Sequence, residues 1–176
     1  MGEIRFVTDT RMFLDDRLLN QIYDVVAPSM RSNAKFYDPS SIEDALKAYE
    51  PERFKQWAEP FLFSVFAYDG NRLVGNGFLK YRKFRDDLLE TESGYLFGGF
   101  VDPTYHRKGI GKEILKRRID YAKALGIKVL RANASEASLK MAQSMGAAKI
   151  GVHVDETLKN LDGTPAKLHL LEYRLQ

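Results

Sequence analysis

The chain has 176 residues, of which 44% are apolar, 29% are charged and none is cysteine. Without cysteine there is no disulfide framework, no thiolate zinc site and no cysteine nucleophile, and three widely spaced histidines lead us to expect no metal centre. A net charge of +3 is too small to indicate a dedicated nucleic-acid binder, although locally concentrated charge would suit a small anion.

The first third of the chain is predicted to form one short strand and three helices. Ile4–Val7 alternates as a strand does, and Asp15–Val26 has apolar residues at helical spacing, with Pro28 expected to end the helix. Ser41 is expected to cap a second helix that has acidic residues in its first turn. Residues 51–59 follow as a third, short helix that begins with proline.

The middle of the chain is predicted to be strands. Residues 61–68 and 72–81 flank the turn Asp69-Gly70-Asn71, which indicates a hairpin. We expect the charged stretch 83–92 to connect this hairpin to a third strand at 94–101.

The remaining residues alternate between helices and strands. The expected elements are a helix at 109–125 closed by Gly126, a strand at 127–130, a helix at 135–145, and strands at 149–154 and 167–175 around a loop at 155–166. The length suggests one domain over residues 1–176. The element order predicts an α/β (α+β) fold with a mixed, mostly antiparallel sheet of about seven strands flanked by helices.

The segment with the clearest chemistry is Tyr105-His106-Arg107-Lys108-Gly109-Ile110-Gly111-Lys112, which leads directly into the helix at 109–125. A helix N-terminus leaves about four N–H groups unpaired and carries roughly +0.5 charge. Gly109 and Gly111 have no side chain to keep a phosphate away from those groups. The pattern indicates an anion site with a basic surround, made by Arg107, Lys108 and Lys112 and continued by Lys116, Arg117 and Arg118.

Two common phosphate loops do not fit this segment. A Walker loop requires Gly at 106 and Ser or Thr at 113, where this chain has His106 and Glu113, and a dinucleotide fingerprint requires a third glycine at Ile114. Gly98 and Gly99 interrupt the preceding strand, as glycines do at a bulge or where a ligand approaches closely. The interpretation that remains is a loop that binds a diphosphate and directly follows a strand interrupted by glycines.

These residues resemble the GNAT superfamily of acyl-coenzyme A-dependent N-acyltransferases. The family loop, Q/R-x-x-G-x-G/A after a Val-x-Pro strand end, corresponds to Val101-Asp102-Pro103 and His106 to Gly111, with His106 at the Gln or Arg position. The element order also matches. The resemblance implies an N-acetyltransferase that moves an acetyl group from acetyl-coenzyme A to a primary amine of a small molecule or peptide by direct attack, without a metal.

The resemblance also places the donor. The pantetheine arm would lie against strand backbone near Gly99 to Val101, and the amide of Val101 would stabilise the tetrahedral oxyanion. The diphosphate would lie on the amides of residues 107–112. The implied donor-binding set is Gly99, Phe100, Val101, His106, Arg107, Lys108, Gly109, Ile110, Gly111, Lys112, Ser135 and Ser138.

A second family signature, N-x-x-A/S-x-x-x-Y-x-x-x-G-F, departs from the family at its tyrosine. Aligned on Gly146, it places Ser135 at the Asn position, Ser138 at the Ala/Ser position and Ala142 at the Tyr position. The usual proton donor to the thiolate is therefore missing. General acid catalysis contributes about 10²–10⁴-fold, so its loss slows the reaction without preventing it. Ser138, a water, Tyr95 or Tyr105 are the candidate substitutes.

The general base and the acceptor pocket are also implied by the resemblance. Glu92, just before the strand at 94–101, is the favoured base, with Glu90 and Asp87 as weaker alternatives. Arg31 and Tyr37 are the candidate acceptor-binding residues. Met30, Phe36 and Trp57 line the same region or simply pack there, and His153 and His169 are expected to be structural.

Two other functions stay open from the sequence. The missing tyrosine is compatible with a module that binds acyl-coenzyme A as a sensor, and the basic helix with a nucleic-acid binder, which the small net charge disfavours. No apolar run approaches the roughly 20 residues of a membrane span, and the first residues lack the apolar core of a secretory signal. We therefore expect a cytoplasmic protein without nucleic-acid or membrane partners. The apolar terminal strands are compatible with a homodimer.

Overall fold

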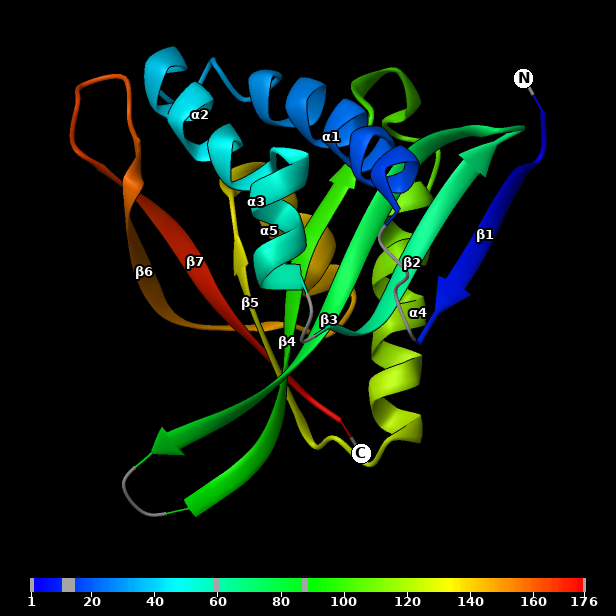
Figure 1. The fold of residues 1–176 in the computed structure, drawn as a ribbon. Coiled ribbons are helices and arrows are strands. Elements are labelled where there is room, and N and C mark those ends of the chain that lie inside the picture. Colours follow the sequence, from blue (N-terminus) through cyan, green and yellow to red (C-terminus); the bar gives the residue numbers. More distant parts are fainter. Residues whose placement is uncertain (1, 11–14, 59–60, 87–88, 176) are drawn as a thin grey trace.

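A mixed β-sheet forms the centre of the protein (Figure 1). The computed structural model describes residues 2–10, 15–58, 61–86 and 89–175, with backbone alone at 57–58, 61–62, 81–86 and 89–92. Within these ranges the sheet has seven strands in the order β1-β2-β3-β4-β5-β7-β6. The pairs are antiparallel except β4–β5, which is parallel. The predicted fold class is confirmed.

The elements follow the predicted order along the chain. The strands are β1 (Ile4–Asp9), β2 (Phe61–Asp69), β3 (Arg72–Asp86), β4 (Leu89–Val101), β5 (Val129–Ala134), β6 (Ala148–Lys159) and β7 (Pro165–Arg174). The helices are α1 (Asp16–Arg31), α2 (Pro39–Leu46), α3 (Pro51–Ala58), α4 (Ile110–Ala124) and α5 (Glu136–Ser144), with short 3₁₀ turns at Lys47–Tyr49 and Pro103–Tyr105.

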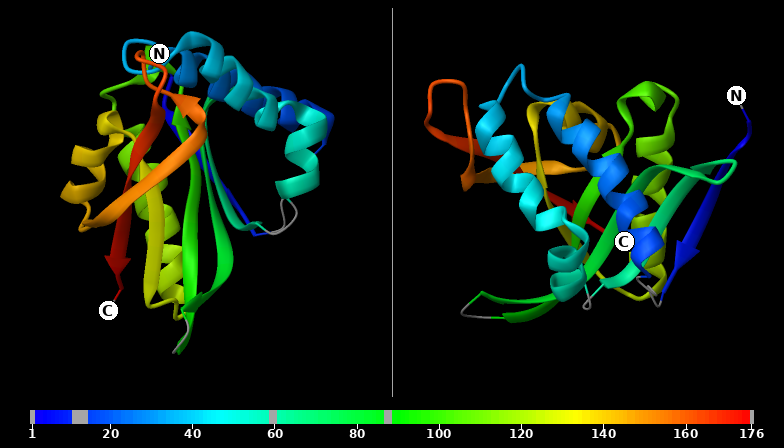
Figure 2. Two further views of the ribbon diagram at one scale, coloured as in Figure 1. Left: turned by 90° about the vertical axis from the view of Figure 1, so that its left-hand side faces the viewer. Right: turned by 45° about the horizontal axis from the view of Figure 1, so that its top comes forward.

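Helices cover both faces of the sheet (Figure 2). On one face α1, α2 and α3 bury apolar residues such as Ile22, Val26 and Leu46 against the sheet. On the other, α4 and α5 do so with Ile114 and Ala142. Each strand alternates its side chains between the two faces, so one sheet serves two apolar cores. No helix in the described part of the chain is both long and apolar enough to cross a bilayer.

Two predictions about helix ends were wrong. α1 continues through Pro28 to Arg31. A proline near a helix end removes a single backbone hydrogen bond. Burial of Ala27 and Ser29 stabilises the last turn of α1 despite this loss. The cap of α2 is Asp38, whose carboxylate accepts from the Ser41 N–H at 3.0 Å, with Pro39 in the first turn.

The charged stretch 83–92 is not a simple connection, because residues 83–86 extend β3 and residues 89–92 extend β4. β3 and β4 continue as a long hairpin that projects beyond the sheet in Figure 1, with pairing from Tyr81↔Gly94 to Asp86↔Leu89. β2 pairs with β3 only up to Lys80, and β5 meets β4 only from Ser93. Among the described residues this ribbon pairs with no third strand, and a two-stranded ribbon is less constrained to alternate apolar and polar residues than a strand inside a sheet. Composition therefore suggested a loop.

Candidate functional site

The sheet opens as a fork between its two parallel strands. β4 and β5 pair from Ser93↔Val129 to Leu96↔Ala132 and then separate. Beyond that point β4 still pairs with β3, where the Asp102 N–H donates to Val74 O at 2.9 Å. Because backbone groups alternate in direction along a strand, those of Val101 point away from β3 and into the fork. The Val101 carbonyl there is contacted by His106, and the Val101 N–H is the group that an extended molecule can pair with.

A bulge in β4 lies at the base of the fork. Gly98 has a φ of +58°, a conformation that favours glycine, and the β3–β4 register shifts between Asn76 and Phe78. The Asn76 amide donates to Gly98 O at 2.9 Å, and the guanidinium of Arg118 donates to Phe97 O at 3.2 Å. Side chains from β3 and α4 therefore hold the bulge in place.

Two cavities meet at the fork from opposite faces of the sheet. The larger has a volume of about 680 Å³ and is lined by the region from α1 to Tyr49, by β4 and by the β6–β7 hairpin. The smaller has about 110 Å³ and lies under α4 and α5. The residues that line both are Leu96, Gly98, Gly99, Phe100, Asn133 and Ser138. A reaction between molecules bound in the two cavities would therefore take place at the bulge.

The predicted anion loop has the expected backbone. Gly109 caps α4 with a φ of +79°, and Arg107 also has a positive φ, of 62°. The Gly109 carbonyl accepts from Glu113, as the first helical bond. In the described structure, the N–H groups of Arg107 and of residues 109–112 donate no hydrogen bond within the protein. A Cβ at Gly111 would lie 3.5 Å from the Met141 sulfur, so glycine keeps this approach to the smaller cavity open.

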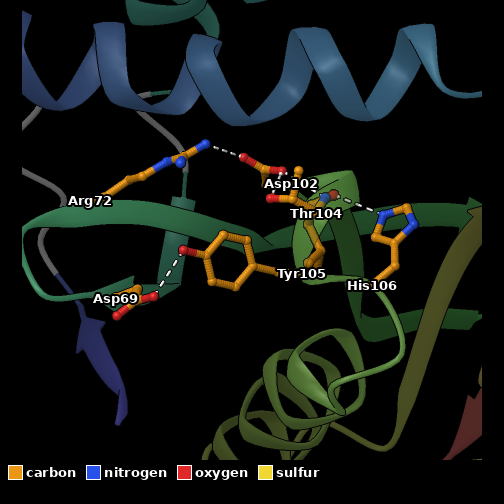
Figure 3. A network of polar contacts seen from close by, with 7 residues as sticks. Asp69, Arg72, Asp102, Thr104, Tyr105 and His106 are labelled. Atoms are coloured by element: carbon orange, nitrogen blue, oxygen red, sulfur yellow. Dashed lines mark hydrogen bonds and ion pairs between the residues drawn. The ribbon is translucent and has the colours of Figure 1, made fainter. Parts of the chain in front are cut away.

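A polar network anchors the segment between β4 and the loop (Figure 3). The buried Asp102 carboxylate accepts from Arg72 at 2.6 Å and from the Thr104 N–H and hydroxyl at 2.9 and 2.7 Å. Burial alone would raise the pKa of Asp102, but the hydrogen bonds from Thr104 and the charge of Arg72 outweigh it and lower that pKa. The carboxylate is therefore ionised at neutral pH.

Two aromatic side chains of the predicted motif have structural contacts. The His106 Nε2 lies 3.0 Å from Val101 O, which ties the loop to the end of β4. The Tyr105 hydroxyl donates to Asp69 at 2.9 Å (Figure 3). Tyr105 lines neither cavity, so its position does not favour a role in proton transfer.

The expectation of a continuous basic face along α4 was wrong. Arg107, Lys108 and Lys112 are exposed around the loop, as predicted. Further along the helix, however, Lys116 pairs with Asp120 and Arg117 with Glu113. Arg118 is buried among apolar residues. The basic side chains that remain exposed at the start of α4 are therefore Arg107, Lys108 and Lys112, whereas the positive charge further along the helix is paired or buried.

The candidate catalytic residues are distributed around the fork. Ser138 lines both cavities and donates to Ser135 O at 3.2 Å, and Tyr95 lines the larger one. Ala142 is buried against the smaller cavity and has no hydroxyl to offer there. The backbone of Glu92 and Glu90 belongs to β4, but their side chains, and Asp87 entirely, lie outside the described residues.

The two predicted acceptor-binding residues lie in different surroundings. Tyr37 is buried and lines the larger cavity, as does Met30. Arg31 does not line it, because its guanidinium makes a two-point contact with Glu43 at 2.7 and 2.8 Å on the surface. Phe36 is exposed, and the side chain of Trp57 lies outside the described residues.

The two remaining histidines lie in the last strands. His169 pairs with Glu136 at 2.7 Å, whereas His153 is exposed on β6. Among the side chains that the structure describes, no three His, Asp or Glu residues come together as a metal site would require.

Sequence analysis did not predict, among others, that Tyr49, Asp155, Arg118 and Tyr173 line the cavities. Tyr49 and Asp155 contribute to the larger cavity, Arg118 and Tyr173 to the smaller. For Arg118 a signal existed, since it lies four residues after Ile114 and four before Ala122 on the apolar side of its helix. The other three carry no such signal, because sequence spacing does not show which strand and loop residues meet at a fork.

Comparison with known proteins identifies the family. The model of the acetyltransferase (GNAT) family matches residues 20–147. The chain belongs to this family. It is therefore an acyltransferase. A search of curated proteins finds no match.

Solved structures agree with the family in fold. A GCN5-related N-acetyltransferase from Rhodopseudomonas palustris has a TM-score of 0.72 at 14% identity, covering 99% of this chain and 96% of that one. The PaiA N-acetyltransferase from Thermoplasma acidophilum, in complex with coenzyme A, has a TM-score of 0.65 at 20% sequence identity. The match covers 98% of this chain and 99% of that one. The ribosomal-protein-S18-alanine N-acetyltransferase from Escherichia coli has a TM-score of 0.66 at 14% sequence identity. The match covers 98% of this chain and 95% of that one. At these identities the likeness concerns the fold.

Proposed function

We propose that this GNAT protein transfers an acetyl group from acetyl-coenzyme A to the primary amine of a small molecule or peptide. The observation that carries the proposal is the fork itself. It joins a narrow cavity beside a helix N-terminus to a larger cavity on the opposite face of the sheet. One relative of the same fold was solved with coenzyme A.

The residues of the narrow side fit coenzyme A. The N–H groups of residues 107–112 and the exposed side chains of Arg107, Lys108 and Lys112 would hold the diphosphate. The pantetheine arm would pair with the outward backbone groups of β4 around Gly99 to Val101, as an added strand pairs with a sheet edge. Ser135 and Ser138, at the start of α5, would border the arm on its other side. The bound thioester supplies an activated acyl group.

The residues of the larger cavity fit an amine acceptor. Aromatic rings form much of its wall, including Tyr37, Tyr49 and Tyr95, and among its lining residues the carboxylates of Asp44 and Asp155 outnumber the single cation, Lys80. An amine must lose its proton before it attacks. An α-amine of pKa about 7.8 loses it at a cost of about 1 kcal/mol at pH 7, whereas a lysine-like amine costs about 4–5 kcal/mol. Glu92 remains the proposed base for this step.

The bulge positions the reacting groups. The Val101 N–H points into the fork and would donate to the oxyanion that forms on the acyl carbonyl. Tyr95 lies on β4 and lines the larger cavity, and Ser138 lies on α5 and lines both cavities, so they would contact the amine and the thioester. Direct transfer needs no nucleophile from the protein.

The test combines binding and turnover. Calorimetric titration with coenzyme A should show binding to the wild-type protein and at least tenfold weaker binding to Gly111→Val, whose side chain would enter the narrow cavity. Gly151→Ala, far from the loop in β6, is the matched control, because a Cβ there meets only Leu170 at 4.0 Å. Equal binding by wild type and Gly111→Val would refute the proposed donor site.

Turnover distinguishes an enzyme from a sensor. Release of free thiol from acetyl-coenzyme A, measured with a panel of α-amino, lysine-like and polyamine acceptors, should depend on the amine. The buried Ala142 at the usual tyrosine position is the observation that favours a sensor. Tight binding of coenzyme A with no release above the blank for any amine would support that second function.

A further inference from the structure

Arg118 is a buried cation on the apolar side of α4. Its side chain is among the buried residues of the protein, with 5% of its surface exposed. It donates to three backbone carbonyls, Ile114 O and Phe78 O at 3.3 Å and Phe97 O at 3.2 Å. Among the described side chains, no carboxylate forms an ion pair with it. A buried charge without a counter-charge destabilises the folded protein, which points to a function for the Arg118 guanidinium.

Arg118 lies at the closed end of the fork. Phe97, whose carbonyl it contacts, is the first residue of β4 beyond the last pair with β5. A Cβ placed on Gly99 would lie 3.1 Å from the Nη2 atom of Arg118, and Nη2 donates no hydrogen bond within the described structure. Arg118 also follows Gly111 by two turns of α4, which corresponds to about 10 Å along the helix axis. Gly111 and Arg118 line the same narrow cavity, so a donor held by its diphosphate at the loop and extending along that cavity would bring its sulfur end towards Arg118.

Tyr173 brings a hydroxyl to the same cavity from another element. It lies on β7 opposite Leu130, is 3% exposed, and lines the narrow cavity together with Arg118. Burial raises the pKa of Tyr173 to about 12, against the opposing influence of Arg118, so the phenol keeps its proton at neutral pH. Burial likewise lowers the pKa of Arg118, to about 10, which leaves the guanidinium charged.

We propose that Arg118 and Tyr173 stabilise the thiolate that leaves the acyl donor, in place of the hydroxyl absent at Ala142. This inference rests on the proposed acetyl transfer. In that step the amine nitrogen forms a bond to the acyl carbon, the carbon–sulfur bond breaks, and its electron pair goes to sulfur. The amine gives up one proton to water and the sulfur later takes one up, so amine and thioester become amide and thiol without another reactant. Arg118 offers its charge to the developing thiolate, and Tyr173 donates a hydrogen bond to it.

The first test is the rate with leaving groups of different acidity. A hydrogen bond to a charged group is worth about a ten- to hundredfold effect, so Tyr173→Phe and Arg118→Met should each lower kcat with acetyl-coenzyme A by about that factor. The loss should be much smaller with the S-acetyl ester of 4-nitrothiophenol, because its more acidic thiol needs less stabilisation. Tyr121→Phe, a ring on α4 that stacks on Phe63 at 4.1 Å and lines neither cavity, is the control. An equal loss with both esters, or no loss, would overturn the inference.

A second test does not depend on turnover. The thiol of bound coenzyme A, titrated by the ultraviolet absorbance of its thiolate, should have a pKa about one unit or more below that of the free thiol in the wild-type protein. In Arg118→Met the shift should largely disappear, and in Arg118→Lys it should persist. If no amine is acetylated while the shift is present, the proposed acetyl transfer fails and the role of Arg118 and Tyr173 in that step fails with it, although the two residues still stabilise a bound thiolate. If amines are acetylated while the bound thiol titrates as the free one does, the inference fails alone, and if coenzyme A does not bind, both fail. If Arg118→Met does not fold, the same titration is made with Tyr173→Phe, which removes only one oxygen atom.

Discussion

Replacing Asp102 by asparagine should destabilise the protein by about 2 kcal/mol. The carboxylate divides its contacts, with Thr104 N–H and hydroxyl on Oδ1 and Arg72 on Oδ2. Asparagine can keep its oxygen at the first position, so the change removes one charge-assisted hydrogen bond and places an NH₂ group against Arg72. Such a bond contributes about 1.5–3 kcal/mol, and the exposed Arg72 side chain can turn to water, which favours the lower half of that range. For a domain of this size the melting temperature should fall by about 4–8 °C.

The stability difference between wild type and Asp102→Asn should depend on pH. Because the pKa of Asp102 is lower in the folded protein than in the unfolded chain, its contribution is present above the unfolded value of about 3.9 and is lost as the pH falls through the folded value. Urea denaturation at pH 7 and at pH 3 should therefore give a large difference between wild type and Asp102→Asn at pH 7 and a smaller one at pH 3. In Arg72→Met the further change Asp102→Asn should cost little. A difference that is the same at both pH values would refute the assignment.

Two further substitutions test the bulge and the anchor of the β6–β7 hairpin. Gly98→Ala combines a positive φ with a Cβ that would lie 2.8 Å from Phe78, so urea denaturation should show a loss of about 2–4 kcal/mol, against almost none for Gly151→Ala. Ser41→Ala removes the hydroxyl that accepts from the part-buried Lys159 N–H at 3.0 Å and should cost about 1–3 kcal/mol, and a stability equal to wild type would show that water replaces this bond.

Local patterns in the sequence predicted the fold and the anion loop well. Apolar periodicity located the helices, and the pair Gly109 and Gly111 indicated a helix start with accessible amides, as observed. The pattern was less informative where tertiary contacts decide. Pro28 does not end α1, whose last turns keep the buried residues Ala27 and Ser29, and residues 83–86 and 89–92 form strands that pair with no third strand in the described sheet.

The site beyond the loop depended on topology. The sequence predicts Arg118 as part of the basic surround of the anion site, although its spacing from Ile114 and Ala122 places it on the apolar side of α4. Tyr173 could not be singled out, because its hydroxyl reaches the donor cavity only through the pairing of β7 with β5. The role of Glu92 stays a prediction.

The fork has a consequence for inhibitor chemistry. Since the two cavities open on opposite faces of the sheet and share residues such as Gly99 and Ser138, a covalently joined donor–acceptor conjugate would have to thread the sheet at that point. The linking atoms would lie between β4 and β5, just beyond the point where the two strands stop pairing. We therefore expect a short, unbranched linker to fit best. Under the proposed function each substrate would enter from its own face of the sheet, so neither would block the other and we expect no compulsory order of binding.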